Sequence, residues 1–184
     1  MKLLVGTTNE HKLKEIQHIL GTKVEGCGLK VAETGKTFEE NAIKKAKAVA
    51  RKFKTAAIAD DSGLMVDCLN GAPGVRSARF ASPPTPYNLC TKLLSVMKNC
   101  KNRKAQFVCV IALVQSDGKV KTFKGIVKGR IIDEMRGTHG FGYDPIFVPD
   151  GYKKTFAEMS PAVKNRISHR AKALKKLKEM LAGV

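Results

Sequence analysis

The sequence predicts an α/β fold with a mixed central sheet. Short apolar runs of strand length alternate along the chain with segments whose apolar residues recur at helical spacing. Asp117-Gly118, a strong hairpin signal, separates two apolar runs at about 105–115 and 119–128, so these strands should be antiparallel. With 184 residues, the chain is long enough to bury most of its apolar surface in one domain, or in two lobes that share a core.

The first half of the chain should form two strands and two helices. Residues 2–6 are expected to form a buried strand, and the apolar residues between Leu13 and Leu20 predict a helix after it. A second strand or extended segment is expected at 24–31. A helix over 37–53 follows, because it opens with the Thr-x-x-Glu pattern of a capping box.

The second half should add three more strands and two helices. A strand over 56–59 is expected to end at Asp60, where Ser62-Gly63 turns the chain away, and 64–69 is expected to be extended. An amphipathic helix over 86–99 precedes the hairpin. A single last helix begins at Ser160-Pro161, with Ser as cap and Pro at the first position, and continues to about Leu181.

The composition narrows the classes of protein to consider. The net charge of +18 raises the local concentration of anionic partners, whether nucleotides or nucleic acid. No stretch is long and apolar enough for a membrane span, and the polar residues that follow the first few positions do not fit a signal peptide. The five cysteines are scattered and contain no Cys-x-x-Cys pair. We therefore expect reduced thiols and a cytoplasmic location, without a zinc ribbon or a disulfide framework.

Two adjacent carboxylates, Asp60 and Asp61, follow the apolar run that ends at Ala59. Neighbouring carboxylates repel each other unless a cation or strong donors neutralise them. Mg²⁺ would remove that cost, since it commonly binds one or two carboxylates together with substrate phosphates. The alternative is a solvated turn, because Asp-Ser-Gly is ordinary turn chemistry.

Three other segments carry possible ligand groups. The polar loop Thr7-Thr8-Asn9-Glu10-His11-Lys12 between a strand and a helix could present free N–H groups to a phosphate, although Thr8 or Asn9 could equally serve as a helix cap. Glu33 has no local duty, whereas Glu40 is explained by the capping box. The glycine-rich segment 136–145 could approach a ligand closely and offers two aromatic rings, or it is a flexible surface loop.

Three cations near the C-terminus fall off the apolar stripe of the predicted last helix. They are Lys164, His169 and Arg170. Taken alone, each is explained as a solvated cation.

Together these segments resemble the inosine triphosphate pyrophosphatase family, also called the Ham1-like family. The blocks that carry the resemblance are Thr7-x-Asn9-x-x-Lys12, Glu33-Thr34-Gly35-x-Thr37-Phe38-x-Glu40-Asn41-Ala42, Ala59-Asp60-Asp61-Ser62-Gly63-Leu64, Pro73-Gly74-Val75 with Ser77-Ala78-Arg79, Gly140-Phe141-Gly142-Tyr143-Asp144-Pro145, and Ser168-His169-Arg170. Each block alone is a weak signal. Their occurrence in this order over nearly the whole chain is a strong one.

The resemblance implies a single Ham1-like domain over residues 1–184, with a twisted mixed sheet, flanking helices and two lobes separated by an active-site cleft. It implies a homodimer that hydrolyses ITP, dITP and XTP to the nucleoside monophosphate and diphosphate with Mg²⁺ as cofactor. Purine nucleoside triphosphates are the implied partners, and nucleic acid is not required.

By position, the resemblance assigns roles to individual residues. Asp61 would be the base that activates water, and Glu33 with Asp61, and Asp60 close by, would form the acidic metal cluster. The implied substrate contacts are Thr7, Thr8, Asn9, Glu10, His11, Lys12 and Lys45 on the phosphate side, Ser62, and Phe141, Gly142, Tyr143, Asp144, Lys164, His169 and Arg170 around the nucleotide and purine.

The chemistry of such a site accounts for selectivity. Donors such as Arg170 and His169 would pair with the ring oxygen of inosine or xanthine and would face an amino group in the standard purines, and an unpaired hydrogen-bonding site discriminates strongly. Thr8 and His139 stand where the family commonly has Gly, so the backbone could differ there. Two rival functions are a pyrophosphatase for other modified nucleotides, such as pyrimidines, and a basic nucleic-acid-binding module suggested by the net charge.

Overall fold

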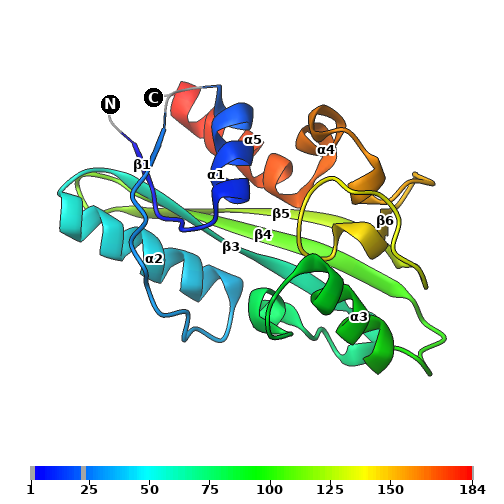
Figure 1. The fold of residues 1–184 in the computed structure, drawn as a ribbon. Coiled ribbons are helices and arrows are strands. Elements are labelled where there is room, and N and C mark those ends of the chain that lie inside the picture. The colour runs from blue at the N-terminus through cyan, green and yellow to red at the C-terminus, as the bar shows by residue number, and fades with distance from the viewer. Residues whose placement is uncertain (1–2, 22–23, 184) are drawn as a thin grey trace. The chain divides into compact units, whose positions relative to one another are not determined.

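A computed structural model of the chain describes residues 3–21 and 24–183. Six strands form one sheet in the order β2-β1-β3-β4-β5-β6 (Figure 1). The strands are β1 Leu4–Val5, β2 Glu25–Gly26, β3 Ala57–Val66, β4 Lys104–Val114, β5 Val120–Ile131 and β6 Phe147–Pro149. Because β1 is parallel to β2 and β3 while β6 is antiparallel to β5, the sheet is mixed, as predicted.

The predicted hairpin joins β4 to β5. At its tip the Gln115 N–H donates to the Lys119 carbonyl at 2.9 Å, and at its far end the Ile131 N–H donates to the Arg103 carbonyl at the same distance. The two bonds belong to the same antiparallel register, so the pairing of β4 with β5 is not shifted between the two ends of the hairpin. The loop between this closing pair has three residues, 116–118: the Gly118 N–H donates to the Gln115 carbonyl at 2.9 Å, and Gly118 takes the left-handed conformation, with φ +82°, that ends such a loop.

Five α-helices accompany the sheet in the described part of the chain: α1 Glu10–Leu20, α2 Phe38–Phe53, α3 Pro86–Val96, α4 Pro161–Ile167 and α5 His169–Ala182. Asn9 caps α1 by accepting from the Lys12 N–H at 3.1 Å, and Thr37 caps α2 by accepting from the Glu40 N–H at 3.1 Å. The Glu40 carboxylate accepts from the Lys36 N–H instead of the Thr37 N–H, so only half of the predicted capping box forms.

The chain folds into two compact units. The first comprises Met1–Ser62, Cys109–Gly125 and His169–Val184, and the second comprises Gly63–Val108 and Ile126–Ser168. In the first unit α1 and α5 cover one face of the sheet and α2 covers the other (Figure 1). Buried apolar residues of β1, α1, β4 and α5 form a core in this unit.

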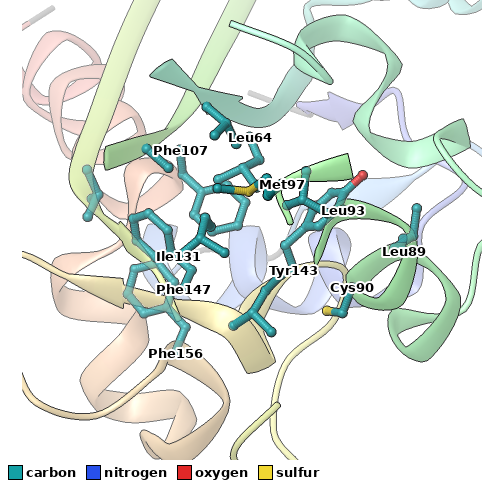
Figure 2. Packing of buried hydrophobic residues seen from close by; sticks show 14 of the residues in the cluster. Leu64, Leu89, Cys90, Leu93, Met97, Phe107, Ile131, Tyr143, Phe147 and Phe156 are labelled. Atoms are coloured by element: carbon teal, nitrogen blue, oxygen red, sulfur yellow. The ribbon is translucent and has the colours of Figure 1, made fainter. Parts of the chain in front are cut away.

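The second unit has its own core, built around three aromatic rings (Figure 2). The rings of Phe107 and Phe147 meet edge to face with their centroids 4.7 Å apart, and Phe156 lies 5.3 Å from Phe147. Leu93 and Met97 of the α3 segment are fully buried in the same cluster. This packing fixes the β6 segment, which follows the glycine-rich loop.

The structure corrects the predicted end of the third strand. β3 does not turn at Ser62-Gly63 but continues to Val66, because Leu64 and Val66 are buried in the core of the second unit. Asp60 and Asp61 therefore lie in the middle of an interior strand. The segment 67–69 is a short 3₁₀ helix instead of an extended one.

The predicted single C-terminal helix is also wrong. Ser168 is extended, with φ −65° and ψ 160°, and separates α4 from α5. The helical backbone that begins after Ser160 is therefore interrupted at Ser168, although the apolar pattern of the sequence runs on. Lys164, His169 and Arg170 are buried instead of solvated.

Smaller differences concern the short strands and the cysteines. The predicted strand 2–6 begins at a residue outside the described ones, and β1 is shorter than predicted. Only Glu25–Gly26 of the segment 24–31 forms a strand. Cys68 and Cys100 form a disulfide with Cα atoms 6.1 Å apart, whereas the sequence predicted reduced thiols.

Candidate active site

Asp60 and Asp61 face opposite sides of β3. Side chains alternate along a strand, so neighbours in sequence cannot share a face. Asp60 contacts Lys12 of α1 and Arg170 of α5, whereas Asp61 contacts α2 on the other side of the sheet (Figure 1). The repulsion expected between the two carboxylates is thus relieved by cations on both sides of the strand, and the charges of Lys12 and Lys45 act on both aspartates.

Asp60 is buried in a network of cations. Its Oδ2 atom lies 3.1 Å from Lys12 Nζ and 3.1 Å from Arg170 Nη2. The same Nη2 donates to Ser62 Oγ at 3.0 Å, and Arg170 Nη1 donates to Glu15. Burial alone would raise the pKa of Asp60, but Lys12 and Arg170 outweigh it and hold that pKa well below its ordinary range. Asp60 is therefore a permanently ionised group at neutral pH.

Asp61 has a different environment on the α2 side. Its Oδ2 accepts from Asn41 Nδ2 at 3.0 Å, and its Oδ1 lies 3.7 Å from Lys45 Nζ. Lys45 Nζ also donates to Glu33 at 2.7 Å, so one ammonium lies between two carboxylates. Burial raises the pKa of Asp61 and outweighs the opposing effect of Lys45 and Lys12, so this carboxylate binds a proton more readily than an ordinary aspartate.

Asn41 connects Asp61 to the turn that carries Glu33. Its Oδ1 accepts from the Gly35 N–H at 2.7 Å while its amide nitrogen donates to Asp61. A Cβ atom at Gly35 would come within 2.7 Å of the same Asn41 oxygen, so only glycine fits this turn without displacement. The turn and Asp61 are thereby held by one fully buried side chain.

A second group of predicted residues gathers around Asp144 in the second unit. Asp144 Oδ2 accepts from the Phe141 N–H at 2.9 Å and from Lys164 Nζ at 2.6 Å. Lys164 Nζ lies 4.7 Å from the centre of the Phe141 ring, within the range of a cation–π contact. Gly140 has φ +76° and packs directly on the Asp144 carboxylate. The aromatic ring and the ammonium are thus positioned by a single carboxylate.

Tyr143 points into the core of the second unit (Figure 2). Its hydroxyl donates to the Ser77 carbonyl at 2.8 Å, and burial raises its pKa. The Tyr143 side chain is 3% exposed, so it anchors the glycine-rich loop to the core of the second unit. The Gly142 carbonyl, beside it, lies 3.6 Å from Cys90 Sγ of α3.

The glycine-rich loop is docked on the segment 155–158 and is not a freely flexible surface loop. The N–H groups of Thr138 and His139 both donate to the Ala157 carbonyl, at 3.1 and 3.0 Å. Thr155 Oγ1 donates to the Arg136 carbonyl at 2.8 Å and accepts from the Glu158 N–H. These bonds fix both the start of the loop and its path toward Phe141.

The family model of the Ham1 family matches residues 3–180 of this chain. The chain belongs to the Ham1 family. A dITP/XTP pyrophosphatase of Desulforamulus reducens is 47% identical, with 98% of this chain and 96% of that protein covered.

Solved structures agree with the family assignment. The Ham1 protein of Staphylococcus aureus has a TM-score of 0.90 and 42% identity, covering 100% of this chain and 99% of its own. A HAM1 protein of Coxiella burnetii has a TM-score of 0.91 and 38% identity over the full length of both chains. The predicted fold class and family are thus confirmed.

The predicted phosphate-side residues of this Ham1 chain lie at the start of α1 and on α2. Thr7 Oγ1 accepts from the Asn9 N–H at 3.1 Å, and Asn9 caps α1, which confirms the helix-cap interpretation for that residue. Thr8, Glu10 and His11 are exposed. Lys12 and Lys45 each reach a carboxylate of β3. Their contacts with substrate stay predictions.

The predicted purine-side residues divide between the two units. Phe141, Gly142, Tyr143, Asp144 and Lys164 belong to the second unit, and His169 and Arg170 belong to the first. Arg170 is fully buried, and its Nε, Nη1 and Nη2 donate to Asp60, Glu15 and Ser62. Its role as a purine donor stays a prediction.

The chain's oxygen ligands fit a hard divalent cation bound with substrate. In the described residues, no three His, Cys, Asp or Glu side chains form a group that could hold a metal ion. Glu33 and Asp61 nevertheless share one cation, Lys45 Nζ. Mg²⁺ commonly takes one or two carboxylates and completes its shell with phosphates and water. Asp60 lies on the other face of β3, so it does not complete this pair.

Two residues of the site were missed by sequence reasoning. Asn41 is part of a family motif, but no role was predicted for it. An asparagine among the buried positions of an amphipathic helix was the signal that could have indicated one. Glu15 lies three residues after Lys12, on the same side of α1, and pairs with Arg170. Nothing local to Glu15 predicts that partner, since it is 155 residues away along the chain.

In the described part of the chain, no helix combines the length and the apolar character needed to cross a bilayer.

Proposed function

We propose that this chain hydrolyses dITP, ITP and XTP between the α and β phosphates, releasing the nucleoside monophosphate and diphosphate. The observation that supports it most is the placement of two adjacent carboxylates on opposite faces of β3, Asp60 between Lys12 and Arg170 and Asp61 beside Asn41 and Lys45, and their pKa shifts in opposite directions agree with it. When two titratable neighbours are pushed apart in pKa, the environment separates a fixed charge from a proton acceptor. The curated relative that bears the name dITP/XTP pyrophosphatase supports the substrate class.

Asp61 is the general base in this proposal. Its carboxylate takes a proton from the attacking water, and Asn41 keeps it oriented by holding Oδ2. A raised pKa makes Asp61 a stronger base than an ordinary aspartate. The proton passes from water to the carboxylate as the water oxygen bonds to a phosphorus of the α–β bridge. The bond from that phosphorus to the bridging oxygen breaks, and the monophosphate and diphosphate separate.

Lys12 and Lys45 neutralise the charge of the phosphates. Phosphoryl transfer depends on positioning and on charge stabilisation more than on covalent chemistry, so paired ammonium groups beside the base suit it. Glu33 and Asp61 would hold Mg²⁺, which supplies further charge neutralisation when it is bound. Lys45, whose ammonium donates to Glu33 at 2.7 Å and lies 3.7 Å from Asp61, would contact the phosphates from beside this pair.

The Asp144 group is proposed to bind the purine. Phe141 offers a ring for stacking, and Lys164 offers a donor for a ring oxygen. Asp144 orients both through its two hydrogen bonds. A homodimer accompanies the proposal as a prediction from the family resemblance. The cytoplasmic location stays a prediction from the scattered cysteines, a premise that the Cys68–Cys100 disulfide does not support.

The test is a comparison of kcat/KM for ITP, XTP, GTP and dUTP with Mg²⁺. The proposal expects ITP and XTP to exceed GTP and dUTP by at least about a hundredfold, the scale on which mispaired donors discriminate. Comparable values for all four would reject purine selectivity. Preference for dUTP would favour a pyrophosphatase for modified pyrimidines.

A further inference from the structure

The exposed side of α2 carries a line of cations that the proposed reaction does not use. Lys44, Lys47, Arg51 and Lys54 recur at intervals of three and four residues, so they lie along one face of the helix and its C-terminal cap. All four are exposed. We call these residues the α2 basic stripe. Lys45, which reaches Asp61, lies on a different side of the helix.

The stripe is not neutralised by the chain itself. No acidic residue occurs between Glu40 and Asp60. In the described part of the chain, Lys47, Arg51 and Lys54 form no ion pair, and Lys44 donates only to the Thr34 hydroxyl. Like charges at such spacing destabilise a helix. The helix dipole favours cations in the last turn, which explains Arg51 but not Lys44 or Lys47.

We propose that the α2 basic stripe binds the phosphate backbone of a duplex nucleic acid without reading its sequence. From Lys44 to Lys54 the stripe covers about 15 Å at the rise of an α-helix. Phosphates of one DNA strand follow each other at about 3.4 Å along the duplex axis, so the stripe spans about four of them. Its charge complements the backbone, and the whole chain adds a net +18.

The chemistry of the stripe favours a duplex over other anionic partners. A single strand would need a series of exposed aromatic rings on which successive bases stack, and α2 exposes only the Phe53 ring, which is not part of the stripe. An anionic membrane would need exposed apolar side chains beside the cations. The apolar side of α2 is instead mostly buried, through Phe38, Ala42, Ala46 and Val49, and exposes one large apolar side chain, Phe53, at its last turn on a different side of the helix from the stripe.

The test compares two charge-reversed variants of the full-length protein in duplex binding. Lys47→Glu/Arg51→Glu changes the stripe, and Lys175→Glu/Lys178→Glu makes the same change of net charge on the exposed side of α5. Binding of a fluorescein-labelled duplex of mixed sequence is measured by anisotropy across a salt series. We expect the stripe variant to bind at least about tenfold more weakly, with the salt slope reduced by about 2, and the α5 variant to stay close to wild type.

The alternatives give different results. Equal losses in both variants would mean that net charge alone is responsible and would overturn the proposal. So would the absence of duplex binding by the wild type at physiological salt, or binding to anionic vesicles in place of the duplex. Full displacement of the duplex by ITP would place it in the substrate site and would also overturn it. Unchanged ITP turnover in the stripe variant shows that the fold is intact.

Discussion

Asp60 and Asp61 are adjacent on β3 and yet have opposite electrostatic environments. The Asp60 carboxylate is held ionised by Lys12 and Arg170, while burial raises the pKa of Asp61. Strand alternation places them on opposite faces, so a single short motif supplies one structural charge and one candidate base. Substitutions at and around the two aspartates should separate these two roles.

Asp60→Asn should cost stability. Removing one partner of a buried ion pair leaves Arg170 without its main counter-charge, a loss of about 3–5 kcal/mol. For a chain of this size, the melting temperature should fall by roughly 10 °C. The depressed pKa of Asp60 contributes stability above the unfolded value of about 3.9 and loses it as the pH falls toward the folded value. Thermal melts from pH 7 to pH 2 should therefore show a flatter acid limb for the variant, and an unchanged curve would contradict the assignment.

Lys45→Met should move the pH dependence of catalysis. Lys45 lowers the pKa of Asp61, so its removal raises that pKa further, and the acid limb of kcat/KM shifts to higher pH. In the wild type this limb should already lie above the ordinary aspartate pKa of about 3.9. Lys47→Met on the exposed side of α2 is the control and should leave the limb in place. An identical pH profile for both variants would show that Lys45 does not affect the pKa of the base, Asp61.

Thr155→Val should weaken purine recognition while chemistry on a bound substrate continues. The substitution keeps the shape but removes the hydroxyl that bonds to the Arg136 carbonyl and the Glu158 N–H. The loop that carries Phe141 then loses an anchor, so KM for ITP should rise and the preference over GTP should fall. Thr155→Ser restores the hydroxyl and should recover both. A loss confined to thermal stability would show that Thr155 has no part in recognition.

Reduction of the Cys68–Cys100 disulfide should destabilise the second unit. A cross-link over 32 residues typically contributes about 2–4 kcal/mol. Cys68→Ser, or a thiol reductant, should therefore lower the melting temperature by roughly 5–15 °C. Cys27→Ser removes a free thiol and serves as the control. If Cys68→Ser and Cys27→Ser melt alike, the bond does not form in solution.

Much of the fold could be predicted because its signals are local. The Asp117-Gly118 turn, the cap at Thr37 and the apolar spacing of α1 each depend on a few neighbouring residues. The break at Ser168 could not be found in this way, since Ser160-Pro161 starts one helix and the apolar spacing continues across the junction. The position of this break depends on how α4 and α5 pack, which the local sequence does not show.

The site was predicted as a set of residues but not as an arrangement. Family motifs named Glu33, Asp60, Asp61 and Lys45, and treating the two aspartates as one cluster missed their alternation along β3. The bond from Asn41 to Asp61 spans 20 residues and the pair of Glu15 with Arg170 spans 155. Such contacts follow from how the helices cross the sheet, which no local pattern encodes.

The central claim, that Asp61 is the catalytic base, is tested most directly by kcat for ITP in Asp61→Asn. The account predicts a fall of about a hundredfold to ten-thousandfold, the usual contribution of a positioned base. The melting temperature at pH 7 should be equal or higher, because the raised pKa means that the ionised Asp61 costs stability above the ordinary aspartate pKa. Asp67→Asn, an exposed aspartate just after β3, should retain full activity. Turnover by Asp61→Asn close to the wild-type rate would contradict the account.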